Sequence, residues 1–364
     1  MHIKLEGKTL RDALSRSGPV ATRATGYGAE MYSSARLEAN ADTLTITAAN
    51  PELQVKQRIP AASLLRPGTL LVPREQLIRI AKETETVEIE EKKNQIHISA
   101  AGTIFRLNKP TVEPPEREAV KDGRSVFLKG GELKQLLKQT LRFASRDSTR
   151  LILNGILLET RPQEIRAVAT DGHRLSLSTL PRSNGDERAG VTIPSQVAQL
   201  ILGVANDEDD VEIRIGENTI EASGPEYEIR GALFEGEFPD YEKVIPTENP
   251  HAVEIGKKDL LESVQRLKLI ADQGHCCVRL SFSAGKLNLD IQNPNLGEAT
   301  DTLDIEGGDK VPEIGMNVGY LIDALETIGE DKVKIGINDA SSPALVTGYS
   351  HNDNPLIVIM PMRL

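Results

Sequence analysis

The segment Ile165–Gly172, with the sequence IRAVATDG, has the alternating apolar pattern of a β-strand and ends in an Asp-Gly turn signal. The same pattern occurs at Leu44–Pro51 (LTITAANP) and at Leu287–Pro294 (LNLDIQNP), where the turn signal is Asn-Pro. A pattern that recurs at a fixed spacing predicts a repeated structural unit. The sequence therefore predicts three copies of one strand–turn–strand element, about 120 residues apart.

Two amphipathic helices are predicted in each copy, one before the strand–turn–strand element and one after it. Their apolar residues follow the i, i+3, i+4 spacing that places them on one helical face. Pro73 and Pro194 lie at or near the start of two of the later helices, where the N–H that proline lacks is not needed. Asn317 is the predicted N-cap of the third. The six predicted helices span Lys8–Gly18, Arg74–Glu83, Gly131–Arg146, Pro194–Asn206, Lys257–Ala271 and Val318–Ile328.

Each later helix is followed by another alternating strand, at Val87–Glu90, Val211–Arg214 and Val333–Gly336. Antiparallel hairpins with two helices per copy predict helices that cover one face of a sheet. The expected fold class is therefore α+β, in three repeated domains. Linkers rich in proline and charge, at 110–124 and 246–250, place the domains at 1–120, 125–247 and 249–364.

The distribution of charge and aromatic residues limits the kinds of nucleic-acid binding. The chain of 364 residues has a formal net charge of -11, and aromatic residues make up 3% of it. So few rings argue against single-strand binding by base stacking. Positive charge is concentrated on the predicted helices, and the remainder is acidic. Two interpretations stay open: Lys and Arg suit solvated helical faces, and they also form a salt-sensitive track for a polyanion. No recognition helix or zinc spacing predicts base-specific binding.

The N-terminus lacks the apolar region of a signal peptide, and no apolar run approaches the roughly 20 residues needed to span a membrane. The only cysteines, Cys276 and Cys277, are adjacent and cannot form an ordinary unstrained disulfide. They are interpreted as two small core residues in a reducing compartment. We therefore expect a cytoplasmic protein.

An acid, a glycine, a histidine and an arginine follow one another at Asp171–Arg174, as they could in a catalytic loop. One hypothesis is a hydrolase or metal enzyme that uses Asp171 and His173. The other histidines show no metal-ligand spacing, and the sequence has no nucleophile elbow, phosphate loop or HExxH motif. A structural turn is the favoured interpretation, with no catalytic residue, no metal and no other cofactor.

The chain ends in an apolar run, Leu356–Leu364 (LIVIMPMRL). Its first part, Leu356–Ile359, is predicted to be a strand, and Pro361 stops the pairing beyond it. Met360 and Met362 flank that proline and offer a soft apolar surface of the kind that accepts varied partners. The alternative, that this end of the chain folds onto the core, is equally open from the sequence.

Five segments together resemble the bacterial DNA polymerase III beta subunit family, the sliding clamps, and the resemblance covers the whole chain. They are Arg150–Leu158 (RLILNGILL), Ala169–Leu175 (ATDGHRL), Phe238–Pro246 (FPDYEKVIP), Met316–Tyr320 (MNVGY) and Met360–Leu364 (MPMRL). The resemblance implies a head-to-tail homodimer that forms a ring of six similar domains, with helices lining a central hole and sheets outside. It implies a processivity factor that encircles duplex DNA without sequence specificity and has no catalytic activity.

The resemblance also implies partners and contact residues. The partners would be the DNA polymerase III alpha subunit, the clamp loader delta subunit and repair factors, which would insert short apolar motifs into one cleft. The implied DNA contacts are Arg23, Arg74, Arg79, Lys82, Lys138, Arg142, Arg146, Arg150 and Arg266. The implied cleft residues are Leu153, Thr170, Gly172, His173, Arg174, Leu175, Pro239, Lys243, Val244, Asn317, Tyr320, Pro343, Val358, Ile359, Met360, Pro361, Met362, Arg363 and Leu364. The implied seam of the ring joins Phe105 and Leu107 to Leu269 and Ile270 of a second copy.

Two places depart from the family pattern. Leu151 and Ile152 stand where some members carry a pair of tyrosines, so tyrosine contacts to DNA are lost there. Lys243 stands at an arginine position of the cleft and keeps the charge without the bidentate geometry. A divergent clamp paralogue that serves repair or antibiotic resistance is the alternative function, because its fold and cleft would be the same.

Overall fold

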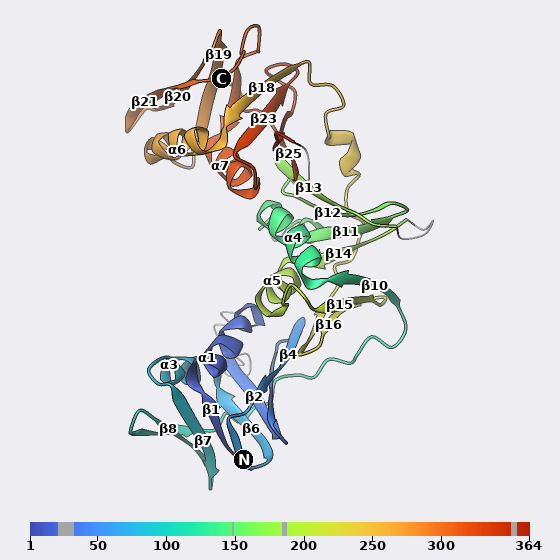
Figure 1. Cartoon of the computed structure of the whole chain (residues 1–364), viewed down its shortest axis with the longest axis vertical. Helices are drawn as coiled ribbons and strands as arrows, with labels where there is room; N and C mark the ends of the chain where they lie inside the picture. Colours follow the sequence, from blue (N-terminus) through green and yellow to red (C-terminus); the bar gives the residue numbers. More distant parts are fainter. Residues whose placement is uncertain (21–32, 148, 184–187, 351–354) are drawn as a thin grey trace. The chain divides into compact units, whose positions relative to one another are not determined.

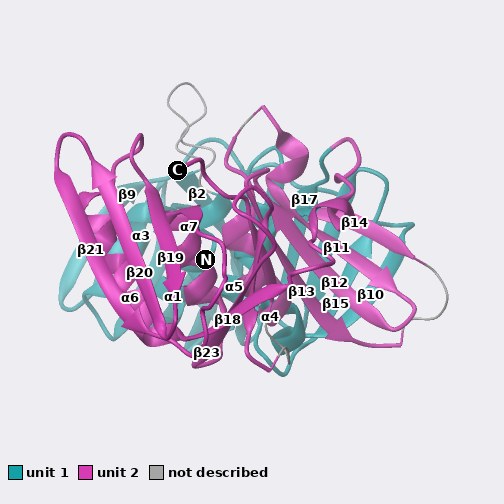
Figure 2. Cartoon of the chain, turned by 90° about the horizontal axis from the view of Figure 1, so that it is seen from above, with its two compact units in different colours: residues 1–134, 193–234 teal, residues 135–192, 235–364 magenta. Residues whose placement is uncertain are grey.

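A computed structural model describes residues 1–20, 33–147, 149–183, 188–350 and 355–364 (Figure 1). The described strands form four sheets, in two compact units. Unit 1 comprises residues 1–134 and 193–234, and unit 2 comprises residues 135–192 and 235–364 (Figure 2). In these ranges no helix is both long enough and apolar enough to cross a membrane.

Unit 1 is built on a five-stranded sheet and an eight-stranded sheet. The five-stranded sheet has the order β5 (Ser63–Arg66), β1 (His2–Glu6), β7 (Thr86–Lys92), β8 (Gln95–Ala100) and β9 (Thr103–Asn108). The eight-stranded sheet has the order β10 (Arg124–Lys129), β15 (Asp210–Ile215), β16 (Thr219–Gly224), β17 (Tyr227–Ala232), β4 (Leu53–Pro60), β3 (Thr43–Ala49), β2 (Ser34–Asn40) and β6 (Gly68–Pro73). The antiparallel pairing of β17 with β4 joins strands from the first and second predicted copies.

Unit 2 is built on a second eight-stranded sheet and a four-stranded sheet. The eight-stranded sheet has the order β14 (Ala189–Pro194), β11 (Gly155–Arg161), β12 (Glu164–Thr170), β13 (Arg174–Pro181), β25 (Leu356–Ile359), β24 (Ala344–Gly348), β23 (Lys332–Ile337) and β18 (His251–Gly256). The four-stranded sheet has the order β21 (Gly297–Asp304), β20 (Lys286–Asn293), β19 (Cys277–Ser283) and β22 (Ile314–Asn317). Here β13 and β25 join the second and third predicted copies.

The α+β class with antiparallel sheets is confirmed, and each predicted copy contains a strand, a helix, further strands, a second helix and three closing strands. Apolar stripes explain the helices: in α1, for example, Leu10, Ala13 and Leu14 are buried. The predicted cap is also present, because Asn317 Oδ1 accepts hydrogen bonds from the backbone N–H groups of Gly319 and Tyr320 in the first turn of its helix. The described α-helices are α1 (Gly7–Arg16), α3 (Arg74–Lys82), α4 (Gly130–Thr140), α5 (Ser195–Val204), α6 (Lys257–Leu267) and α7 (Val318–Thr327).

Two predicted helices are shorter than expected, because their last turns tighten into 3-10 helices. Helix α4 ends at Thr140, whose hydroxyl donates to a carbonyl of its own preceding turn, and η2 (Leu141–Phe143) follows. Helix α6 ends at Leu267 and is followed by η5 (Lys268–Ile270). Each of these 3-10 turns offers a backbone carbonyl to a turn between strands.

The prediction that both cysteines are core residues was wrong. Cys276 and Cys277 are free thiols of intermediate exposure. They lie where the chain enters β19, and the Asn317 side-chain amide donates to the Cys276 sulfur at 3.2 Å. The apolar run in the sequence therefore begins at the partly exposed end of a strand and not in the centre of a core.

Candidate functional site

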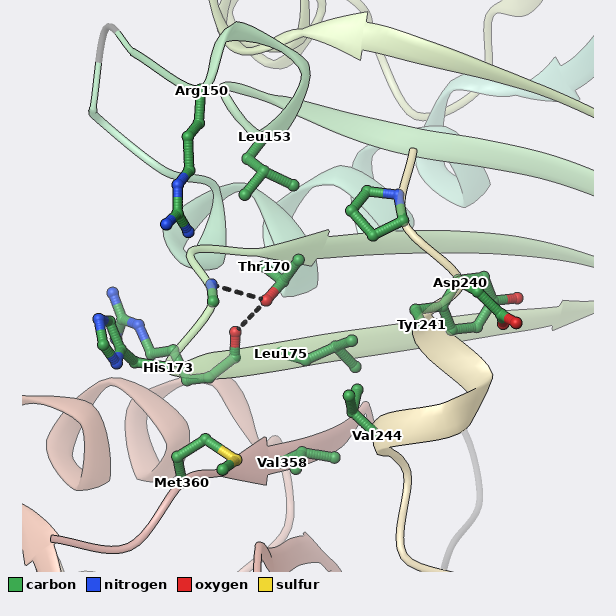
Figure 3. Close-up of a pocket in the computed structure, with 13 residues that line it drawn as sticks. Arg150, Leu153, Thr170, His173, Leu175, Asp240, Tyr241, Val244, Val358 and Met360 are labelled. Carbon is green, nitrogen blue, oxygen red and sulfur yellow. Dashed lines mark hydrogen bonds between the residues drawn. The ribbon is translucent and has the colours of Figure 1, made fainter. Parts of the chain in front are cut away.

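A pocket of about 220 Å³ lies in unit 2, where the turn after β12, the strand β25 and the segment 239–244 come together (Figure 3). Figure 3 shows Arg150 and His173 on one side of it and Asp240 and Tyr241 on the other, with Leu175 between them and Val358 and Met360 below. The lining residues are Arg150, Leu153, Thr170, Gly172, His173, Arg174, Leu175, Pro239, Asp240, Tyr241, Val244, Val358 and Met360.

The turn at Thr170–Arg174 is held by its own side chains. The Thr170 hydroxyl donates to the Arg174 carbonyl at 2.7 Å and accepts from the Gly172 N–H at 3.1 Å. The Asp171 carboxylate accepts from the backbone N–H groups of His173 and Arg174 at 2.9 and 3.1 Å. Gly172 has a φ of 89°, which favours glycine because it has no Cβ. The sequence Thr-Asp-Gly thus specifies this turn locally.

Apolar side chains from two neighbouring strands form the floor of the pocket. Leu175 of β13 pairs with Val358 of β25, and each is 2% exposed. The Met360 N–H donates to the His173 carbonyl at 2.9 Å, which extends the pairing beyond the end of β25. The side chain of Met360 is 40% exposed at the pocket. The end of the chain therefore contributes to the pocket through Met360, its first residue after the strand.

One wall of the pocket comes from the segment between the second and third predicted copies, where η4 (Tyr241–Val244) lies. The Tyr241 hydroxyl donates to Glu159 at 2.8 Å and accepts from Arg161 at 2.9 Å. Burial raises the pKa of the Tyr241 hydroxyl. Burial also acts to raise the pKa of Glu159, but the hydrogen bonds from Arg161 and Tyr241 outweigh it and lower that pKa. This network fixes the wall to β11.

The corresponding place in unit 1, where β4 meets β17, is polar instead. The Arg117 N–H donates to the Gln54 side chain at 3.0 Å, and Arg230 donates to the Arg117 carbonyl at 2.7 Å. Lys56 donates to Glu116 at 2.8 Å. These side chains from sheet and linker bond to one another. The junction in unit 2 differs among the described residues, because the exposed apolar side chains of Val244 and Met360 lie there over a buried floor of Leu175 and Val358.

Ten of the nineteen predicted cleft residues line the pocket, and nine do not. Among the nine, Ile359 is buried, Asn317 caps α7, and Lys243 is 80% exposed in an ion pair with Asp240. The Met362 N–H donates to the Gly315 carbonyl of β22 at 2.8 Å, so Met362 is bound to that strand and does not line the pocket. The others outside the lining are Tyr320, Pro343, Pro361, Arg363 and Leu364. The predicted roles of all nineteen stay predictions.

Three lining residues were missed as cleft residues. Asp240 and Tyr241 lie inside the motif FPDYEKVIP, and Arg150 begins the motif RLILNGILL. The motifs were therefore a sufficient signal, but the sequence could not show which of their side chains turn toward the pocket. Arg150 was assigned to DNA contact only. Its guanidinium lies near Gly172, since a Cβ at that glycine would be 3.3 Å from Arg150 Nη1.

The predicted DNA-contacting residues differ in their surroundings. Arg74 is 4% exposed, donates to the Leu14 carbonyl at 3.1 Å and pairs with Glu75, and burial lowers its pKa. A buried guanidinium cannot reach a phosphate, so the assignment of Arg74 to DNA contact was wrong. Arg23 lies outside the described residues. The exposed members are Arg79, Lys82, Lys138, Arg142, Arg146, Arg150 and Arg266, of which Arg142 and Arg266 also form ion pairs.

The predicted seam residues lie at the surfaces of the two units. Phe105 and Leu107 belong to β9, an edge strand of the five-stranded sheet. Leu269 is 82% exposed on η5, and Ile270 is half-buried beside it. An edge strand presents unpaired backbone groups that a second chain can pair with. The surfaces are thus of the kind an interface uses, and the seam itself stays a prediction.

The hypothesis of a catalytic loop finds no support in the geometry. The Asp171 carboxylate is occupied by two backbone N–H groups and by the Arg174 guanidinium at 3.0 Å. Among the residues that the structure describes, no three His, Cys, Asp or Glu side chains are grouped so that they could hold a metal ion. Asp171 therefore serves the turn.

Comparisons with known proteins point to one family. The family models described as "DNA polymerase III beta subunit, central domain" and "DNA polymerase III beta subunit, C-terminal domain" match residues 127–240 and 242–363. The beta sliding clamp of Pseudomonas aeruginosa is 29% identical, with all of both chains covered. That of Escherichia coli K12 is 26% identical over 96% of this chain and 95% of the relative.

Solved structures agree over the full length. The DnaN sliding clamp of Pseudomonas aeruginosa bound to griselimycin is similar with a TM-score of 0.88 and 28% identity, and all of both chains is covered. The DnaN sliding clamp of Bartonella birtlesii bound to griselimycin gives a TM-score of 0.89 at 28% identity, again with all of both chains covered.

Proposed function

This chain belongs to the bacterial DNA polymerase III beta subunit family, the DNA sliding clamps, and we propose that partner proteins bind it in the apolar pocket of unit 2. Sliding clamps are processivity factors without catalytic activity, so the pocket needs only to hold a partner. The observation that carries the proposal is an apolar floor, Leu175 and Val358, beneath an open cavity of about 220 Å³. Clefts of this kind are common ligand sites.

The occupant is a short peptide segment with Leu- or Phe-sized side chains. Burying one such side chain contributes about 1.5–3 kcal/mol, so two of them limit the affinity to about micromolar. Weak binding permits exchange among partners such as a polymerase and a clamp loader. The wall from segment 239–244 and the end of the chain at Met360 enclose the anchors.

Griselimycin is a suitable chemical probe for this pocket. Two clamps that are 28% identical to this chain over their full lengths are described as bound to it. We place its binding here in the same pocket. The first experiment measures, by fluorescence anisotropy, binding of a labelled peptide with adjacent Leu and Phe residues and its displacement by griselimycin. Micromolar binding that griselimycin displaces is the expected result, and a wild-type chain that binds neither molecule overturns the proposal.

DNA contact is proposed for the exposed basic residues Arg79, Lys82, Lys138, Arg142, Arg146, Arg150 and Arg266, now without Arg74, and the prediction for Arg23 lies outside the described residues. Contacts to phosphates are independent of sequence and depend steeply on salt. A ring around DNA should stay on closed circular duplex and be lost when the circle is cut. Retention on linear DNA with free ends at physiological salt would contradict encirclement.

The ring is proposed to form from two copies, each with domains at 1–120, 125–247 and 249–364. The limits of the two matching family models, 127–240 and 242–363, support the second and third of these domains. The seam would join Phe105 and Leu107 of one copy to Leu269 and Ile270 of the other, and the exposure of Leu269 supports it. Light scattering should give about twice the chain mass of 39.7 kDa.

A further inference from the structure

All three nitrogens of the Arg174 guanidinium are engaged within the chain. Nε donates to Asp171 at 3.0 Å, Nη1 to Asp323 of α7 at 2.5 Å, and Nη2 to the carbonyl of Arg142 at 3.1 Å. The side chain is only 10% exposed. These bonds use three of the five N–H groups of the guanidinium, and the low exposure leaves little of it to a visiting peptide, although part of the side chain borders the pocket.

Two aromatic rings hold the same guanidinium from other directions. Its central carbon lies 5.0 Å from the ring centre of Phe143 and 4.4 Å from that of Tyr320. A planar guanidinium can contact rings and carboxylates together, which a lysine ammonium cannot do in the same geometry. Phe143 belongs to η2 and Tyr320 to α7, so Arg174 connects the pocket turn to two helical elements.

The other two copies of the turn show what Arg174 replaces. Asn50 donates from its amide to the Val20 carbonyl at 3.1 Å, at the 3-10 turn after α1. Asn293 donates to the Ile270 carbonyl at 2.9 Å, at the 3-10 turn after α6. The middle copy has Asp171 at this position, which cannot donate when ionised. There Arg174 Nη2 makes the equivalent bond to a carbonyl after α4.

Because Arg174 takes the place of the asparagine amide, the turn of the middle copy is also connected to α7. The Asn293 amide also donates to Asp272 at 2.8 Å, in the segment that follows η5, whereas Arg174 reaches further and pairs with Asp323 of α7 across the junction between β13 and β25. Arg142 shares that carboxylate at 3.2 Å and also pairs with Glu326 of the same helix. Of the two α7 carboxylates, Asp323 and Glu326, Asp323 is therefore the one that bonds to Arg174.

We propose that Arg174 is a positioning residue, which with Asp323 fixes the Thr170–Leu175 turn against α7 so that the pocket is formed before a peptide arrives. The inference rests on the proposed peptide-binding function and gives this arginine a role different from peptide contact. A site that is formed only part of the time binds with an affinity reduced by that fraction. Loosening the turn therefore weakens the binding of every peptide, whatever its sequence.

The test compares two carboxylates of α7. Asp323→Asn removes the partner of Arg174, and Glu326→Gln removes only a partner of Arg142, so it is the matched control. With the labelled Leu-Phe peptide, Asp323→Asn should raise the Kd about tenfold, while Glu326→Gln should stay within about twofold. Asp323→Glu keeps the charge and should recover most of the affinity. An unchanged Kd in Asp323→Asn overturns the proposal, since direct peptide contact by Arg174 predicts that result.

A double variant separates the two roles further. Arg174→Lys should weaken peptide binding about as much as Asp323→Asn, and combining the two should add little, because residues of one interaction are not additive. Fully additive losses would show that the two residues act independently and would refute the proposal.

Hydrogen exchange supplies a readout that does not need a peptide. The amides of 170–175 should exchange faster in Asp323→Asn than in the wild type, while β1 and β7 in unit 1 keep their rates. Unchanged exchange in the turn contradicts the positioning role. If the wild type binds no peptide, the proposed function fails, and this measurement still decides whether Asp323 and Arg174 hold the turn.

Discussion

Two buried tyrosines allow the wall of the pocket to be tested by the same substitution in two places. Tyr241, 4% exposed, donates to Glu159 and accepts from Arg161. Tyr227, 2% exposed in unit 1, has a hydroxyl without a hydrogen-bond partner among the described residues. Removing a hydroxyl bonded to a charged group costs about 1.5–3 kcal/mol, whereas removing an unpaired buried hydroxyl is neutral or favourable. Tyr241→Phe should therefore destabilise the protein by about 2 kcal/mol and Tyr227→Phe should not.

Urea unfolding followed by circular dichroism measures the difference, because the midpoint shifts with stability when the slope is unchanged. The wall also encloses the bound peptide, so Tyr241→Phe should weaken binding of the labelled Leu-Phe peptide several-fold. Tyr227→Phe should leave the affinity unchanged. Equal midpoints for the two variants would refute the reasoning, since they would show that the network around Glu159 contributes nothing.

The same network sets a pH dependence. The pKa of the Tyr241 hydroxyl is raised by burial, so the folded state keeps that proton to a higher pH than the unfolded state does. Its contribution to stability is complete below the unfolded value, about pH 10, and is lost as the pH rises above it. In the same urea experiment, the free energy of unfolding should fall less between about pH 10 and pH 11 in Tyr241→Phe than in the wild type.

Three further outcomes are expected. Val244→Asp places a carboxylate at a wall residue that is 46% exposed, so the dimer should stay intact while the peptide Kd rises at least about tenfold in anisotropy; an unchanged Kd would place peptide binding elsewhere. Arg146→Ala should reduce the slope of log K for DNA against log salt by about 0.9, and Arg74→Ala should lower stability and leave that slope unchanged; the reverse pattern would contradict the burial of Arg74. The Asn293 amide and nearby N–H groups lower the pKa of Asp272 to about 2. Stability from Asp272 is therefore present above about pH 4 and lost toward pH 2, and Asp272→Asn should flatten that loss in an acid titration followed by circular dichroism.

The chain builds one kind of junction twice, and the described residues of unit 2 form an apolar pocket at theirs. The pairs β4–β17 and β13–β25 join successive copies in the same antiparallel way. In unit 1 the linker bonds to the sheet through Gln54 and Arg230. In unit 2 it bonds to the sheet through Tyr241 and Glu159 and leaves an apolar pocket over Leu175 and Val358. A polar junction consumes its own hydrogen-bonding groups, whereas an apolar one leaves surface that gains free energy when it is covered.

Much of this protein could be predicted from local sequence. Alternation, helical spacing and turn signals depend on neighbouring residues, so they located many of the strands, the helices and the three turns at Asn50, Asp171 and Asn293. The motif at Thr170–Gly172 specifies its turn through bonds over two to four positions. The family resemblance then followed from five segments, and the comparisons bear it out.

Only the tertiary structure decided which side chains meet. Arg174 and Asp323 are 149 positions apart, and Tyr241 and Glu159 are 82 apart. No periodicity in the sequence encodes such pairs, because they depend on which strands lie side by side after folding. The same cause misled the assignment of Arg74, whose position on a basic helix is evident from sequence but whose burial against Leu14 is not. Sequence determined the elements and their order, and packing decided which charges remain free to act.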